Sequence, residues 1–264
     1  MVSEFIRAAN IILTATNTQE IAFQVLAVTL NRVVQEGRPF FAQSPETYAN
    51  NIAQIVALGN LTSSRWTITW AGALDPLWGL NPQLHFVATK TISGIPTAAF
   101  IHVQAKLGPE EVESVAKILY MLAETAAIAT SRYPGDLSIY GVGGAIYEGV
   151  VVLIAYRSDQ DTVERLLQQL GNPPLPVVII WIDSQNIVHA TAACGQTGCP
   201  GNIAPQQYAN RIAGALGFQP GLPYRGNNNV YPVPYDPGQE PPPPELSEEE
   251  LEMLMHYFWA MTMR

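Results

Sequence analysis

The chain has 264 residues and a formal net charge of −9; 48% of its residues are hydrophobic and 13% are charged. This hydrophobic content excludes a largely disordered chain, and the length suits one large domain or two small ones. The longest apolar runs, residues 149–156 and 177–182, are shorter than a membrane-spanning helix requires. We recognise no secretory signal, because Glu4 and Arg7 interrupt a short apolar run.

The first third of the chain has the apolar periodicity of helices. Hydrophobic residues recur at helical spacing in residues 18–37, and Gly37 marks the end of that segment. Residues 44–59 begin with Ser44 and Pro45, which suit an N-cap and a first helical turn. We therefore expect the N-terminal third to be helical.

From residue 65 onward, strand-like segments alternate with helical ones. After a strand at residues 66–70, the sequence predicts three hairpins, 85–90 with 97–104, 137–140 with 145–157, and 177–182 with 187–193. The predicted helices are residues 108–131, 158–171 and 205–217. These repeated hairpin–helix units predict an α+β domain over residues 1–235, with a largely antiparallel sheet and its helices on one face.

The composition changes after Gly217. Nine of the 21 prolines fall between Pro220 and Pro244, and residues 236–246 form a proline-rich acidic linker. The residues around 247–251 then fit a helix start, because Ser247 and Glu250 match a capping box. The sequence therefore predicts a C-terminal helix over residues 247–264.

This C-terminal helix has an apolar surface that requires a partner. Beyond Glu252 it is apolar on nearly every side, and an isolated helix of this length is marginally stable in water. Its own domain, a neighbouring copy of the chain and a different protein all remain open as partners. For an oligomer, the expected contact residues are Leu251, Leu254, Met255, Phe258, Trp259 and Met261.

The charge distribution disfavours nucleic-acid binding. Seven of the 22 acidic residues lie in residues 236–264, so the preceding domain is close to neutral. Lysine occurs only three times, and no basic cluster forms. Proteins that bind nucleic acid take much of their affinity from Lys and Arg on phosphates, which this chain does not offer.

The two cysteines, Cys194 and Cys199, are five residues apart. A zinc site needs about four ligands, and the sequence has no matching second pair. A disulfide, two free thiols and one reactive cysteine remain open. Since no phosphate-binding glycine loop occurs either, we expect no metal and no cofactor.

Residues 187–195, IVHATAACG, resemble the cysteine strand of caspase-like peptidases. The resemblance implies Cys194 as the nucleophile and His102 or His189 as the base that activates it. The His-Gly step of those families is absent, because Val103 follows His102. On a regular strand, His189 would point to the face opposite that of Cys194.

The sequence contains no complete catalytic set and favours a self-assembling structural subunit of the capsid, virion or filament type. The tethered apolar helix and the weak surface charge support this hypothesis, because the cores of interfaces are depleted of charged residues. The expected partners are copies of the chain itself in a homo-oligomer. A cysteine-dependent hydrolase that uses Cys194 is the alternative.

Overall fold

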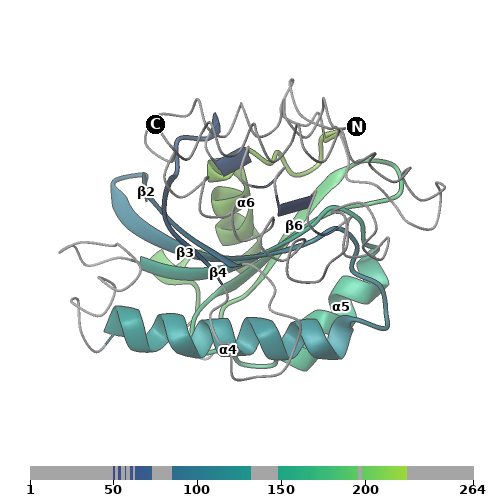
Figure 1. Cartoon of the computed structure of the whole chain (residues 1–264), viewed down its shortest axis with the longest axis horizontal. Helices are drawn as coiled ribbons and strands as arrows, with labels where there is room; N and C mark the ends of the chain where they lie inside the picture. Colours follow the sequence, from purple (N-terminus) through teal and green to yellow (C-terminus); the bar gives the residue numbers. More distant parts are fainter. Residues whose placement is uncertain are drawn as a thin grey trace, which may run out of the picture.

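The computed structural model describes residues 50, 53–54, 57, 60–61, 63–72, 85–131, 148–195 and 198–224. At its centre is a six-stranded mixed sheet with the strand order β1-β2-β3-β4-β5-β6 (Figure 1). The strands are β1 Thr67–Gly72, β2 His85–Ile92, β3 Ile95–Gln104, β4 Glu148–Ala155, β5 Val177–Ile182 and β6 Val188–Ala193. The helices are α4 Val112–Ser131, α5 Gln160–Leu170 and α6 Pro205–Ala215, with a short 3-10 helix at Pro200–Asn202.

The centre of the sheet is parallel. β3 pairs with β4 and β4 pairs with β5 in parallel register, whereas the pairs β1–β2, β2–β3 and β5–β6 are antiparallel. The predicted α+β fold with a largely antiparallel sheet is therefore wrong. α4 lies between β3 and β4 in the chain, and α5 lies between β4 and β5, so each helix supplies the crossover that a parallel pair needs.

The burial of β4 and β5 explains this arrangement. Every residue from Gly149 to Ala155 is buried, and so is every residue of β5. Strands that are buried on both faces are typical of parallel sheets covered by helices on both sides. α4 and α5 cover one face of the sheet and α6 covers the other (Figure 1), so the prediction of helices on one face is also wrong.

The sheet separates two hydrophobic cores, which we name by the helices that cover them. The α6-side core includes Val152 of β4 and Ile212 of α6. The α4/α5-side core includes the next residue of β4, Leu153, and Leu119 of α4. This division follows from strand geometry, because successive side chains point to opposite faces.

Two of the three predicted hairpins are present. β2 and β3 are joined at Ser93 and Gly94, whose φ angles of 51° and 83° suit a tight turn between antiparallel strands. β5 and β6 form another hairpin. The hairpin of residues 145–157 with 137–140 is wrong for β4, because β3 and β5 occupy both of its edges. Residues 132–147 lie outside the described part of the chain.

The predicted helix at 158–171 corresponds to α5, and both of its ends are capped. The Asp159 carboxylate accepts a hydrogen bond of 2.7 Å from the Thr162 N–H and caps the helix. Gly171 ends the helix with a φ of 57°, and its N–H donates to the Leu167 carbonyl. The predicted helices at 108–131 and 205–217 correspond to α4 and α6.

The predicted helical N-terminal third is not supported. Residues 1–49 lie outside the described residues, and only seven residues between positions 50 and 63 are described. Three of those seven, Ala53, Ala57 and Leu61, are buried in the α6-side core. The linker at 236–246 and the helix predicted at 247–264 also lie outside the described residues. Among the described helices, none is long and apolar enough to cross a membrane.

Candidate functional site

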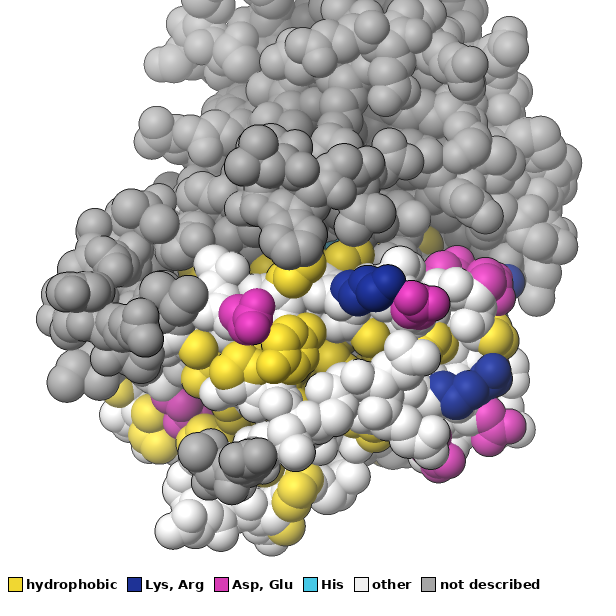
Figure 2. Space-filling view, turned by 90° about the horizontal axis from the view of Figure 1, so that it is seen from below, with side chains coloured by type: hydrophobic (Ala, Val, Ile, Leu, Met, Phe, Trp, Pro, Cys, Tyr) yellow, Lys and Arg dark blue, Asp and Glu magenta, His cyan; other side chains and the backbone are white. Residues whose placement is uncertain are grey.

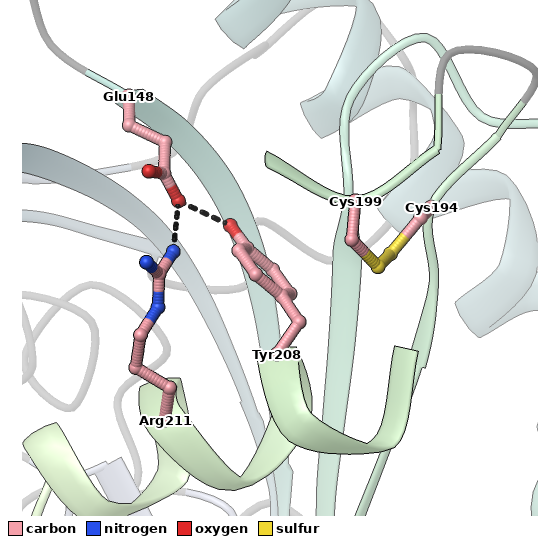
Figure 3. The surroundings of a disulfide bond; sticks show 5 residues. All are labelled: Glu148, Cys194, Cys199, Tyr208 and Arg211. Atoms are coloured by element: carbon pink, nitrogen blue, oxygen red, sulfur yellow. Dashed lines mark hydrogen bonds and ion pairs between the residues drawn. A yellow bond between two sulfur atoms is a disulfide. The ribbon is translucent and has the colours of Figure 1, made fainter. Parts of the chain in front are cut away.

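Cys194 and Cys199 form a disulfide directly after β6 (Figure 3). Of the three states that the sequence left open, the structure has the disulfide. The Cα atoms of the two residues are 4.8 Å apart, and both side chains are buried in the α6-side core. A sulfur in a disulfide is not a thiolate, so Cys194 offers no nucleophile in this state.

The two histidines of the predicted hydrolase lie away from Cys194. His102 is fully buried on β3, where it shares the α4 face with Phe100. Burial, together with the neighbouring His85, holds the pKa of His102 well below its usual value. The structure therefore does not bring His102 to the disulfide, which belongs to the opposite core.

His189 also points away from Cys194, as the alternation of strand residues predicts. Its Nε2 atom is 2.8 Å from Asp183 Oδ2, and its ring stacks on Trp181 of the α4/α5-side core. Neither histidine forms a pair with Cys194, and the residues of the caspase-like hypothesis do not assemble into one site.

A largely buried polar cluster lies near the disulfide and attaches α6 to the sheet (Figure 3). Glu148, the first residue of β4, accepts hydrogen bonds from the Tyr208 hydroxyl at 2.8 Å and from Arg211 Nη2 at 2.7 Å. The Arg211 guanidinium lies 4.9 Å from the centroid of the Tyr208 ring. Burial and the adjacent carboxylate raise the pKa of Tyr208, so its hydroxyl stays protonated and donates to Glu148. We interpret this cluster as structural.

The outward side of α4 has a stripe of four exposed residues, Glu113, Lys117, Tyr120 and Glu124. Their spacings of four, three and four place them along one side of the helix. Tyr120 is 40% exposed, and Lys117 Nζ lies 2.6 Å from Glu113 Oε1. We call these four residues the α4 stripe.

α4 differs from α5, although both helices cover the same face of the sheet. The outward residues of α5 are polar, namely Gln160, Asp161, Glu164, Arg165, Gln168 and Gln169. α4 has only three charged residues among 20, and Ile118 and Met121 are half-buried beside the stripe. Figure 2 shows hydrophobic side chains gathered on this face of the molecule. The outward surface of α4 is thus more apolar than a solvated helix requires.

The sequence predicts the helix at residues 108–131 but not the stripe. Val112, Val115 and Leu119 of this helix lie in the α4/α5-side core. The outward positions of the helix did indicate a contact surface, because Tyr120 and Met121 stand where a surface helix usually has charged residues.

The predicted oligomer contacts on the C-terminal helix, including Leu251 and Trp259, lie outside the described residues. Within the described ranges, no three His, Cys, Asp or Glu side chains are grouped so that they would hold a metal ion.

Comparisons with protein families, with curated proteins and with solved structures find no match to this chain.

Proposed function

We propose that this chain is a self-assembling structural subunit, in which the α4 stripes of two copies pack antiparallel. The observation that carries the proposal is the order of residues in the stripe. Around a two-fold axis at Tyr120, Lys117 of each copy lies opposite Glu124 of the other, and the two Tyr120 rings meet. The stripe is therefore complementary to itself in both charge and apolar surface.

The same stripe disfavours a parallel arrangement of the two helices. In that arrangement each Lys117 would face Lys117 of the second copy, and each Glu124 would face another Glu124. Like charges that face each other across an interface oppose association. The order of charges thus selects one orientation as well as one partner.

The α4 contact alone is weak, so assembly needs a second contact. Exposed ion pairs contribute about 0–1 kcal/mol each, and stable interfaces bury roughly 1,000 Å² or more. In our proposal the predicted helix at 247–264, carried by the linker at 236–246, supplies this contact. Its apolar residues bind a neighbouring copy, and the near-neutral charge of residues 1–235 reduces repulsion between copies.

Sedimentation velocity of charge variants of the full chain tests the α4 contact. Lys117→Glu places two acidic residues opposite each other and weakens association. The double variant Lys117→Glu/Glu124→Lys exchanges the two charges and restores association. Arg165→Glu reverses an exposed charge on α5 instead, and as the matched control it leaves association unchanged.

Two outcomes would contradict the α4 contact. One is a chain that remains monomeric from micromolar to millimolar concentration. The other is a double variant that associates no better than Lys117→Glu alone. In the same assay, deletion of residues 236–264 yields smaller assemblies if the C-terminal helix supplies the second contact, and assemblies of unchanged size would contradict that role.

A further inference from the structure

The carboxyl ends of β3, β4 and β5 border a cavity of about 500 Å³. Lys106 follows β3 and Arg157 follows β4, while Asp183 and His189 come from the β5–β6 hairpin. Open sheets with parallel strands bind their ligands outside the carboxyl ends of those strands, and a cavity of this volume suits a small molecule. Both the position and the volume of the cavity are thus typical of a ligand-binding site.

Hydrogen bonds between the bordering segments fix the walls of the cavity. The Leu107 N–H donates to the Arg157 carbonyl at 2.8 Å, and Ser158 Oγ donates to the Leu107 carbonyl at 3.0 Å. The Ser158 N–H donates to the Ile182 carbonyl at 3.1 Å, which ties both segments to the end of β5. The cavity therefore has its shape before any ligand enters, which lowers the cost of binding.

The carboxylates of the cavity are already engaged within the protein. Asp183 Oδ1 accepts 2.9 Å hydrogen bonds from the N–H groups of Gln185 and Ile187, and Oδ2 pairs with His189. Burial opposes ionisation of Asp183, but these hydrogen bonds outweigh it and hold its pKa below the ordinary value. The Asp159 carboxylate accepts from the Thr162 N–H. The two acids thus have partners of their own.

The cations of the cavity are not engaged in this way. Neither Lys106 nor Arg157 forms an ion pair with any described residue. The Nε atom of Arg157 is buried and has no hydrogen-bond partner among the described residues. Arg157 borders the cavity, and no carboxylate of the described residues balances its charge, so its guanidinium favours a ligand that brings a negative charge. The cations of the cavity, unlike its carboxylates, are thus available to bind an anion.

A pair of stacked rings forms another part of the lining. The ring centroids of Trp181 and His189 are 5.0 Å apart with an interplanar angle of 18°. Trp181 is only 4% exposed, whereas the His189 side chain is 37% exposed. The imidazole therefore covers the indole and presents its outer face to solvent in the cavity. A flat ligand group placed there would extend the stack.

We propose that this cavity binds a small organic monoanion, whose carboxylate is held by Arg157 and Lys106 and whose flat ring lies on His189. The planar guanidinium of Arg157 matches the geometry of a carboxylate. Asp159 and Asp183 border the same cavity and limit its positive potential, so a singly charged carboxylate is preferred over a doubly charged phosphate. The proposal is independent of self-assembly, because none of these residues belongs to the α4 stripe.

Isothermal titration calorimetry of the full chain with three probes tests the site. Benzoate combines a ring with one negative charge, benzamide retains the ring without the charge, and phenyl phosphate carries more charge. We expect benzoate to bind more tightly than either of the other probes. Arg157→Gln weakens benzoate binding by about tenfold or more, since it removes a charge-assisted hydrogen bond. Arg165→Gln, on the outward side of α5, is the matched control and leaves binding unchanged.

A second variant keeps the test independent of folding. Lys106 is exposed, so Lys106→Gln preserves the fold and still weakens benzoate binding. Thermal unfolding of each variant verifies that it is folded. The proposal is overturned by the absence of benzoate binding, by equal binding of benzoate and benzamide, by tighter binding of phenyl phosphate, or by unchanged binding in a folded Arg157→Gln or Lys106→Gln variant.

Discussion

His85 and His102 lie side by side on β2 and β3, with their ring centroids 5.2 Å apart. Among the described residues, neither ring nitrogen of His85 has a hydrogen-bond partner, and Nδ1 of His102 has none either. Burial lowers the pKa of His85 to about 4 and also holds the pKa of His102 well below 6.5. Both imidazoles are therefore neutral at neutral pH, and their protonation opposes the fold.

We expect the free energy of unfolding to fall as the pH decreases from 6.5 towards 4. In this window the unfolded chain binds a proton at His85 that the folded chain does not bind. A pKa that moves from 6.5 to about 4 corresponds to a loss on the order of 3 kcal/mol. The loss is complete below the folded pKa and absent above 6.5. Urea unfolding above pH 6.5 and again near pH 4 measures it.

The matched variant for this prediction is His85→Leu. Because the His85 ring has no hydrogen bond among the described residues, the substitution leaves no partner unsatisfied and retains stability at neutral pH. The variant loses less stability on acidification than the original chain. An identical pH dependence in the two proteins would show that His85 is not the group that titrates.

At the scale of elements, the sequence predicts single strands and helices better than their pairing. The β5–β6 hairpin follows from two adjacent strands with a short turn, which is local information. The strands that pair with β4 are separated from it in the chain by the crossover helices α4 and α5, so its pairing is not determined by local sequence. The unbroken apolar run at 149–155 did contain a signal for a parallel strand, since only a strand buried on both faces has no polar side.

The position of the cavity also depends on strand pairing that the local sequence does not determine. Lys106, Arg157 and Asp183 each stand within two residues of the end of an apolar strand, which is a pattern that the sequence displays. Only the parallel register of β3, β4 and β5 brings these strand ends to one edge of the sheet. The largely antiparallel sheet that the sequence predicts would place alternate strand ends at opposite edges.

The attachment of α6 to the sheet depends on Arg211. The side chains of Arg211 and Glu148 are only 20% and 10% exposed, so Arg211→Met leaves a nearly buried carboxylate with one donor fewer. We expect a loss of about 1–3 kcal/mol in the free energy of unfolding. Urea unfolding measures this loss. Arg165→Met removes an exposed guanidinium instead and costs less than about 0.5 kcal/mol, so equal losses would contradict the structural role of Arg211.

At the scale of the whole molecule, the outer edge of β6 is partly covered. The Val188 N–H donates to the Leu222 carbonyl at 3.0 Å, and the Val188 carbonyl accepts from the Gly221 N–H at 2.8 Å. Further along, Gln206 Nε2 donates to the Ala190 carbonyl at 2.9 Å. An edge that is partly covered in this way offers fewer free backbone groups for strand pairing with another chain. This covering favours the helical face over the β6 edge as the surface where copies meet.

Hydrogen exchange separates these two surfaces directly. Val188 directs its backbone groups away from β5, so the N–H groups of Ala190 and Ala192 point outward as well, and no bond to them occurs among the described residues. Thr191, which is paired with Ile179, directs its N–H towards β5. In dilute samples we expect Ala190 and Ala192 to exchange faster than Thr191, and the buried residues 149–155 of β4 to exchange most slowly. In assembled samples, the amides of Ala190 and Ala192 remain fast if copies meet through α4. Slowing at Ala192 on assembly would instead place the contact at the edge of the sheet.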